Sequence, residues 1–324
     1  ARAVIHDGTS WSLMTSTGSG RNAFCSALVA AANCPVAYII SATSGVPIST
    51  YWSGGKTSGY NSWEAKVTAA GGKLSAFMLW QGEGDVALSR TKAAYKADID
   101  AIFAQLRTDY GAGLPVVIGM LGQTPDGATT DDMMEQIRDA HVDAANDAGN
   151  YGFVYYDCER GGDVHLTAAG YAAANTRAAQ AVAHSRGDAT YSRGPSVAYA
   201  VRTAPTIIDI GITHAGGTDI SPSTGITGFS VLDNGAAVTI SSAVRQAADK
   251  IRLTLASTPT GTVTVRYGHG KLWSLTGTPR DNTGMTLPLI TTDADVTVLG
   301  RKVVLNCIQR VGGAAAASVT GLRW

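Results

Sequence analysis

Two short stretches of this sequence combine residue types that could hydrolyse an ester. In the first, the apolar run Phe77–Leu79 leads directly into a turn of sequence Trp-Gln-Gly-Glu-Gly-Asp, residues Trp80–Asp85. In the second, Asp163 and His165 stand just before Thr167, a residue type that often caps the first turn of a helix. Polar residues that follow a strand lie at the carboxyl edge of a sheet, where open α/β sheets hold their chemistry. Together the two stretches indicate an esterase site.

Ester hydrolysis needs a nucleophile, a base that takes its proton, a group that orients the base, and donors for the oxyanion. His165 is the expected base, because it follows the last predicted strand and should stand at the carboxyl edge of the sheet. The alternative is a solvent-exposed histidine at the start of a helix. Asp163 is the expected orienting group.

Residues near the ends of the second and third predicted strands are candidates for binding the oxyanion and the substrate. A glycine after a strand lets its backbone N–H come close to a substrate oxygen, which makes Gly45 a candidate donor. Gly45 could equally be an ordinary turn glycine. Gln81 and Glu83 end the third strand and are further candidates, although Glu83 and Asp85 could also form a solvated turn.

The elements that must position these residues alternate along the first 184 residues, as they do in βαβ units on a parallel sheet. Between the strand-like runs, apolar residues recur at the 3.6-residue spacing of amphipathic helices. The pattern predicts a three-layer α/β/α sandwich over residues 1–184. Its five expected strands are Ala3–His6, Val36–Ser41, Ala76–Gln81, Val116–Leu121 and Phe153–Asp157.

The pattern changes after residue 184. Residues 185–205 lack clear periodicity and contain Arg-Gly-Asp and Ser-Arg-Gly-Pro, which is typical of a linker. From residue 206 to 324, short segments rich in Val, Ile and Thr alternate with turns of Gly, Pro, Asn and Asp. We therefore expect a second domain at 206–324, a small all-β sandwich.

Charge and hydropathy exclude several kinds of partner. The 25 Lys and Arg residues balance the 25 Asp and Glu residues, so no net field attracts nucleic acid or an anionic membrane. The longest apolar stretches are far shorter than the ~20 residues that span a bilayer. We expect no nucleic-acid and no membrane partner. The chain begins with Ala-Arg, so we expect that any secretion signal or upstream region has been removed.

The four cysteines do not indicate a metal or redox site. They occur singly, without Cys-x-x-Cys spacing, at Cys25, Cys34, Cys158 and Cys307. Small apolar residues belong at positions 25 and 158, so we interpret these two as buried thiols. We expect no metal and no cofactor.

These residues resemble the SGNH (GDSL-like) hydrolases, especially their sialate O-acetylesterase and acetylxylan-esterase-like branch. Trp80–Asp85 is similar to that branch's Trp-Gln-Gly-Glu-x-Asp signature, and Asp163–Gly170 to its final block. Pro35–Trp52 resembles the second block, in which the glycine, here Gly45, is an oxyanion donor. The resemblance implies a flavodoxin-like fold and a serine esterase that removes acetyl groups from a glycan through an acyl-serine intermediate. The β-rich half looks, more weakly, like an accessory domain of such esterases.

The sequence departs from the family in two places. The final block is usually Asp-x-x-His, whereas here Gly162 stands at the position of the aspartate and Asp163 lies two residues before His165. Asp163 could still orient the imidazole, or a carbonyl could do so. The nucleophile block of the branch, Gly-Gln-Ser-Asn, does not occur in the chain.

Ser10 is our predicted nucleophile. Gly8-Thr9-Ser10 follows the first strand and is one substitution from the Gly-Asp-Ser of the wider family. In the competing interpretation, His6–Trp11 corresponds to the segment after the nucleophile block, the nucleophile lies upstream of Ala1, and the chain is a truncated or processed piece. Ser44 is a third candidate.

Two non-enzymatic interpretations stay open. The chain could be an inactive or incomplete esterase scaffold that serves as a carbohydrate-binding or structural module, for instance of a phage tail or cell-surface assembly. Alternatively, the β-rich half could be the functional part, as a structural or oligomerisation domain.

We expect an acetylated glycan as partner, an extracellular, secreted or virion-associated location, and an oligomer, which would be a homotrimer in a phage tail. Four aromatic residues could stack on sugar rings or belong to the core or a lid: Tyr51, Trp52, Tyr60 and Trp63.

Overall fold

The computed structural model has the five strands predicted for the N-terminal half, although the last runs over Asn150–Val154 and not over the predicted Phe153–Asp157. Their bounds are β1 (Ala3–His6), β3 (Val36–Ile39), β4 (Phe77–Leu79), β5 (Val116–Met120) and β6 (Asn150–Val154). The structure describes residues 3–13, 20–125, 127–190 and 193–300. Cys307 and the end of the predicted second domain, residues 301–324, lie outside the described residues.

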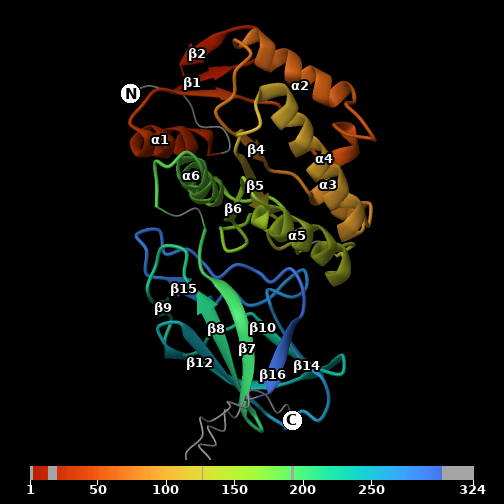
Figure 1. The fold of residues 1–324 in the computed structure, drawn as a ribbon, viewed down its shortest axis with the longest axis vertical. Helices are drawn as coiled ribbons and strands as arrows, with labels where there is room; N and C mark the ends of the chain where they lie inside the picture. The colour runs from red at the N-terminus through yellow and green to blue at the C-terminus, as the bar shows by residue number, and fades with distance from the viewer. Residues whose placement is uncertain (1–2, 14–19, 126, 191–192, 301–324) are drawn as a thin grey trace, which may run out of the picture.

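These strands form two three-stranded sheets, with orders β2-β1-β3 and β4-β5-β6. The pairs β1/β3, β4/β5 and β5/β6 are parallel, as predicted. An additional strand, β2 (Trp11–Leu13), returns antiparallel to β1 as a hairpin. We expected one continuous sheet, but in the described residues neither β1 nor β3 pairs with β4, β5 or β6, so the parallel ladder is divided. Figure 1 shows β1 and β2 at one end of the domain and β4 to β6 nearer the second domain.

Helices cover both faces of these strands, which confirms the three-layer α/β/α prediction. The helices are α1 (Arg21–Ala32), η1 (Ile48–Thr50), α2 (Ser58–Ala69), α3 (Glu83–Ala87), α4 (Lys92–Tyr110), α5 (Asp131–Asn146) and α6 (Ala168–Ser185). Alternate residues of β5 point to opposite layers: Val117 packs in the core that α1 and α6 cover, and Val116 and Ile118 in the core under α2, α4 and α5. Threonine side chains cap α4, α5 and α6, including the predicted Thr167. None of the helices in the described ranges is both long and apolar enough to cross a membrane.

The second domain is mostly β, as expected. Eight strands form one sheet of order β11-β10-β14-β16-β7-β8-β13-β12, and β15 pairs with β9. A short parallel ladder between β16 and β7, with Val298 opposite Ala200, joins two antiparallel four-stranded groups edge to edge. This long-range pairing leaves no local mark in the sequence. The strands are β7 (Ser196–Ala204), β8 (Ile207–Thr213), β9 (Ile220–Ser221), β10 (Phe229–Asp233), β11 (Ala236–Val238), β12 (Ile240–Ala247), β13 (Lys250–Leu255), β14 (Val263–Tyr267), β15 (Arg280–Asp281) and β16 (Val296–Gly300). Because β7 begins at Ser196, the second half of the stretch expected as linker is a strand of this domain.

The buried Arg138 of α5 joins the two domains. Its Nη1 donates to the carbonyl oxygens of Gly268 and Gly270 in the second domain, at 3.0 and 2.8 Å. Its Nη2 donates to the carbonyl of Gly122, which follows β5, at 3.1 Å. The guanidinium also lies over the ring of Trp273, 4.8 Å from the centroid. Burial lowers the pKa of Arg138 to about 10, so the side chain still carries its charge at neutral pH.

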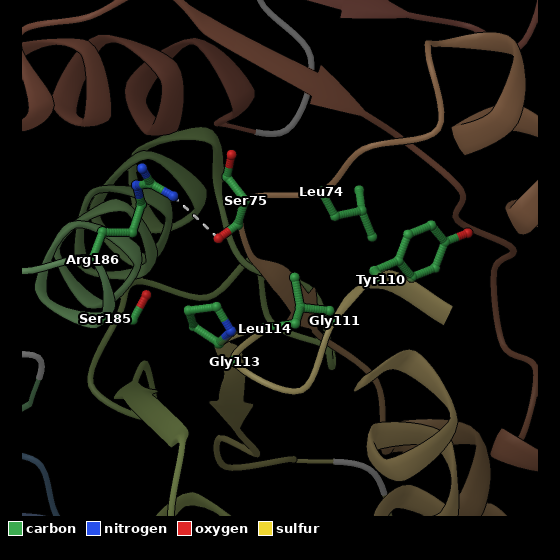
Figure 2. Close-up of a pocket in the computed structure, with 9 residues that line it drawn as sticks. Leu74, Ser75, Tyr110, Gly111, Gly113, Leu114, Ser185 and Arg186 are labelled. Atoms are coloured by element: carbon green, nitrogen blue, oxygen red, sulfur yellow. Dashed lines mark hydrogen bonds between the residues drawn. The ribbon is translucent and has the colours of Figure 1, made fainter. Parts of the chain in front are cut away.

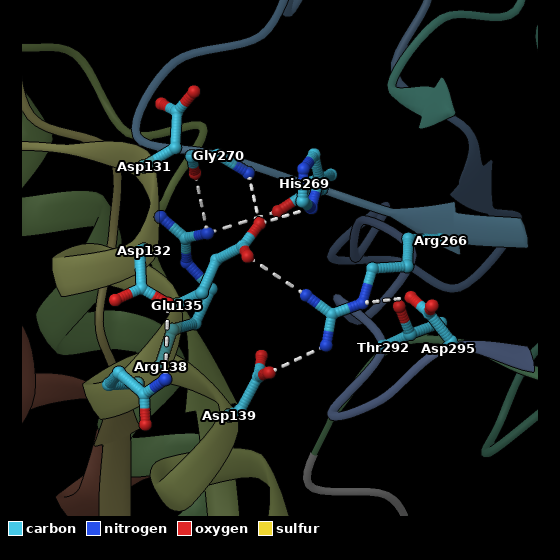
Figure 3. Close-up of polar contacts among 12 residues, drawn as sticks. Asp131, Asp132, Glu135, Arg138, Asp139, Arg266, His269, Gly270, Thr292 and Asp295 are labelled. Atoms are coloured by element: carbon cyan, nitrogen blue, oxygen red, sulfur yellow. Dashed lines mark hydrogen bonds and ion pairs between the residues drawn. The ribbon is translucent and has the colours of Figure 1, made fainter. Parts of the chain in front are cut away.

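A second arginine extends this interface from the other side. Arg266 of β14 pairs with Glu135 and Asp139 of α5 at 3.0 and 2.8 Å, and with Asp295 of its own domain at 2.9 Å (Figure 3). Glu135 also contacts His269 and accepts the backbone N–H of Gly270 at 2.5 Å. One face of α5 is therefore bound to the second domain by ion pairs and by hydrogen bonds to backbone groups.

Candidate functional site

Two glycines let the Trp80–Asp85 turn pack tightly at the carboxyl end of β4. A Cβ on Gly84 would lie 2.6 Å from the carbonyl oxygen of Val46 and 2.9 Å from the nitrogen of Pro47. A Cβ on Gly82 would lie 2.8 Å from the ring of His141, and Gly82 also has a φ of +154°. The turn is thus pressed between the segment that follows β3 and helix α5.

Polar bonds hold this turn to the segment after β3. The buried carboxylate of Asp85 accepts the backbone N–H of Ile48 at 2.7 Å and the side-chain amide of Gln81 at 2.5 Å. The same amide nitrogen of Gln81 donates to the carbonyl of Val46 at 3.2 Å. Both of its hydrogens are therefore bonded within the protein. Gln81, which we expected to donate to the oxyanion, lies beside the proposed donor and holds its segment in place.

Gly45 lies in the exposed turn that these bonds anchor. Its φ is +69°, a left-handed conformation that favours glycine. A Cβ at this position would meet no atom within 4 Å, so the backbone faces open space. In the described ranges, no hydrogen bond uses the N–H of Gly45. In the described residues this N–H therefore has no protein acceptor.

Asp163 and His165 contact each other directly, despite the spacing of two residues. Oδ1 of Asp163 accepts the backbone N–H of His165 at 2.8 Å, and Oδ2 lies 3.1 Å from Nδ1 of the imidazole. These hydrogen bonds lower the pKa of Asp163. With Nδ1–H donating to the carboxylate, Nε2 is left as the basic nitrogen. Both side chains are 65% exposed, so the imidazole faces solvent.

Arg160, which the sequence reasoning missed, supports the loop that carries His165. Its Nη1 donates to the carbonyl of Val164 at 2.9 Å, and the backbone N–H of Gly161 donates to the carbonyl of His165 at 3.0 Å. The guanidinium also presses against Gly122, where a Cβ would lie 2.1 Å from Nη2. Its position shortly before the Asp-x-His motif was the one signal that could have drawn attention to it.

Glu83 lies within electrostatic range of the His165 loop. The hydroxyl of Tyr155 donates to the Glu83 carboxylate at 3.3 Å. Burial and the charges of Glu83 and Asp163 together raise the pKa of Tyr171. Both carboxylates are therefore close enough to this phenol to affect its ionisation. The ring of Trp80 packs against Tyr155 and Tyr171, with centroids 5.1 and 6.2 Å away. The structure thus brings the two predicted motifs together around one aromatic cluster.

The predicted nucleophile is not part of this cluster. Ser10 lies in the exposed turn of the β1–β2 hairpin, where its backbone N–H donates to Asp7 at 2.9 Å. In the part of the chain that the structure describes, neither Ser10 nor Ser44 forms a hydrogen bond with His165. The role of Ser10 as nucleophile stays a prediction.

The aromatic residues after β3 contribute mainly to the core. Tyr60 and Trp63 of α2 are buried, with ring centroids 5.4 Å apart, and Trp63 packs on Phe77 of β4. Tyr51 and Trp52 are partly buried against the same cluster. Of the two interpretations left open for these residues, the structure supports the core.

Neither the buried cysteines nor the pocket at the opposite edge of the strands belongs to the site. Cys25 and Cys158 are buried, and burial raises the pKa of each thiol to about 11, as expected for inert thiols. In the described ranges, no group of three or more His, Cys, Asp or Glu side chains is arranged to hold a metal ion. A cavity of about 440 Å³ lies before β4 and β5, at the opposite edge of the strands, between Ser75, Tyr110 and Arg186 (Figure 2).

Comparison with solved structures bears on the fold. The fold is similar to that of XAC1771, a carbohydrate acetylesterase from Xanthomonas citri, with a TM-score of 0.72 and 15% identity over 90% of this chain and 72% of that protein. A protein from Arabidopsis thaliana is less similar, with a TM-score of 0.46 and 17% identity over 56% of this chain and 79% of that one. No curated protein sequence matches the chain.

The match to a family covers the α/β domain. Residues 6–184, which span both motifs and the strands between them, match the carbohydrate esterases described as sialic acid-specific acetylesterases. This range is more than half of the 324 residues. The chain therefore belongs to the family of carbohydrate esterases that are described as sialic acid-specific acetylesterases.

Proposed function

We propose that this chain removes acetyl groups from a glycan through an acyl-serine intermediate, with His165 as the general base. The observation that carries the proposal is the Asp163–His165 pair, whose orientation leaves Nε2 basic and facing solvent. The family supports an acetylated carbohydrate as substrate. Glu83, next to Tyr155, supplies a carboxylate that could accept hydrogen bonds from sugar hydroxyls.

The mechanism follows from these positions. Nε2 of His165 takes the proton of a serine hydroxyl while the serine oxygen attacks the acetyl carbonyl. The N–H of Gly45 donates to the oxyanion that forms. The imidazolium then returns its proton to the sugar oxygen as the ester bond breaks, which releases the sugar and leaves acetyl-serine. Water, deprotonated by the same imidazole, hydrolyses the acetyl-serine to acetate and free serine.

We propose Ser10 as the serine, on the similarity of Gly8-Thr9-Ser10 to the family's Gly-Asp-Ser. The alternative is a nucleophile other than Ser10. Hydrolysis of p-nitrophenyl acetate by the chain and by its Ser10→Ala and His165→Ala forms tests both. We expect His165→Ala to lower the rate at least 10²-fold and His214→Ala, in the second domain, to leave it unchanged. Loss of activity in Ser10→Ala supports Ser10, whereas an active Ser10→Ala form rules it out.

A second candidate function is a glycan-binding module without turnover. It is favoured by the absence of a hydrogen bond between Ser10 and His165 in the described residues. Labelling with a serine-directed fluorophosphonate separates the two functions. An esterase gives one labelled serine, and His165→Ala prevents the labelling. A binding module gives none but still retains an acetylated glycan on a column.

We also propose that the protein acts outside the cell or on a virion, as an oligomer. Support for self-association comes from Tyr199 and Leu299, exposed apolar side chains on the neighbouring strands β7 and β16. A second copy of the chain would cover them. Light scattering of the purified chain tests the self-association. A monomer at micromolar concentration contradicts it, and Leu299→Asp should dissociate an oligomer.

A further inference from the structure

A continuous series of hydrogen bonds runs through the core behind the site. It begins at the end of β5, where the backbone N–H of Leu121 donates to Nδ1 of His141 at 3.2 Å. Because Nδ1 accepts this bond, the hydrogen of the neutral ring must be on Nε2. His141 is fully buried, and burial together with the charge of Arg138 lowers its pKa to about 3. The ring is therefore neutral, with a defined tautomer.

The next bond fixes the direction of the tyrosine hydroxyl. Oη of Tyr95, also fully buried, lies 2.8 Å from Nε2 of His141 and 2.8 Å from Oε1 of Gln81. Nε2–H donates to the tyrosine oxygen, so the single hydroxyl hydrogen of Tyr95 is donated to Gln81, whose Oε1 at 2.8 Å is a closer acceptor than its backbone oxygen at 3.4 Å. The carbonyl of the Gln81 amide must then face Tyr95, and its nitrogen must face the other way.

The series ends on the segment that carries Gly45. The amide nitrogen of Gln81 donates to Asp85 at 2.5 Å and to the carbonyl of Val46 at 3.2 Å. Asp85 in turn accepts the backbone N–H of Ile48 at 2.7 Å. A rotated Gln81 amide would place its carbonyl oxygen against the Asp85 carboxylate and the Val46 carbonyl, which would repel it. The direction of each bond therefore sets the direction of the next.

We propose that Tyr95 and His141 are positioning residues of the esterase site, which act through the Gln81 amide to hold the Gly45–Ile48 segment in its active conformation. The inference rests on the proposed function, in which the N–H of Gly45 stabilises the oxyanion. Neither residue touches the substrate. Their contribution is to fix the orientation of an amide whose two ends differ only in hydrogen bonding.

Tyr95→Phe tests this with Tyr60→Phe as a matched control. Tyr60 is also buried and donates its hydroxyl to a carboxylate, Asp109, at 2.9 Å, but it lies outside the series. We expect Tyr95→Phe to accelerate hydrogen exchange of the Ile48 amide at least tenfold and to lower kcat for an acetylated sugar roughly tenfold, with KM within twofold. Tyr60→Phe should change neither the exchange of Ile48 nor kcat.

A spectroscopic measurement tests the tautomer directly. In the wild-type chain with ¹⁵N-labelled histidine, we expect the His141 ring to show a protonated Nε2 and an unprotonated Nδ1 down to about pH 4. A protonated Nδ1 at neutral pH would overturn the proposal, because the direction of every later bond depends on it.

The kinetic and exchange results separate the two proposals. If Tyr95→Phe leaves either the exchange of Ile48 or kcat unchanged in an active enzyme, or if Tyr60→Phe has equal effects, the positioning role is refuted. If the wild-type chain hydrolyses no acetyl ester, the proposed function fails. The Ile48 exchange in Tyr95→Phe then decides whether the series holds this segment, and unchanged exchange refutes it.

Discussion

The carboxylate of Asp163 binds His165 twice, through the backbone N–H at 2.8 Å and through Nδ1 at 3.1 Å. The bond to the backbone N–H holds the Asp163 carboxylate beside the imidazole. Asp163 reaches it from two residues before His165, whereas the family's final block usually has the aspartate three residues before the histidine. We expect Asp163→Asn to lower kcat roughly 10²-fold, because an amide nitrogen opposite Nδ1 favours the wrong tautomer of the base. Steady-state hydrolysis of an acetyl ester measures this. Asp188→Asn, an exposed aspartate remote from the site, is the control, and equal rates for Asp163→Asn and wild type would contradict a role in orienting the base.

Gly84 is predicted to be indispensable for packing. A Cβ at this position meets the backbone of Val46 and Pro47 at 2.6 to 2.9 Å, and backbone atoms cannot move aside as a side chain can. We expect Gly84→Ala to lower the free energy of unfolding by about 2 kcal/mol. Urea denaturation provides the measurement. Gly113→Ala, where a Cβ meets no atom within 4 Å, should cost far less; similar losses in the two variants would count against the steric explanation.

Arg138 is predicted to be a major source of stability at the domain interface. Arg138→Met leaves the carbonyls of Gly122, Gly268 and Gly270 without their donor in a buried environment. We expect a loss of about 3 kcal/mol in the free energy of unfolding, measured by urea denaturation. Arg202→Met, which removes an exposed arginine bonded to the carbonyl of Pro205, should change it by less than about 0.5 kcal/mol. Equal effects would show that the interface does not depend on the guanidinium.

His141 predicts a dependence of stability on pH. Its pKa is lowered to about 3 in the folded protein, so the unfolded chain, with a pKa near 6.5, binds the proton more tightly. The stabilisation is complete above pH 6.5 and decreases as the pH falls towards 3, by about 1.4 kcal/mol per pH unit. Denaturation curves between pH 4 and 7 should show a smaller slope for His141→Asn than for wild type. Parallel curves would mean that the buried ring does not resist protonation.

The sequence predicted what depends on local pattern. Apolar runs such as Val116–Leu121 gave the strands, and the polar residues after them gave the Asp163–His165 pair and the Gln81 turn. The prediction was less successful where distant segments meet. The division of the sheet depends on which strands pair, and the single eight-stranded sheet depends on a three-residue ladder between β16 and β7.

The roles of buried polar residues were also beyond the sequence. His141 lies on the apolar stripe of a helix, where nothing in the pattern distinguishes a core residue from one bonded to Tyr95. Gln81 was found from its motif, but two of its hydrogen-bond partners, Val46 and Tyr95, come from other segments. Arg138 and Arg160 are ordinary helix and loop residues until the chain folds around them.

Helix α5 serves both halves of the protein at once. His141 on this helix belongs to the hydrogen-bond series behind the site, while Glu135, Arg138 and Asp139 bind the second domain. A substitution on one face of α5 is therefore limited by what the residues on its other face must bind. An exchange of the second domain between relatives would have to carry the matching residues of α5 with it. The two halves should consequently have evolved as a single inherited unit and not as interchangeable modules.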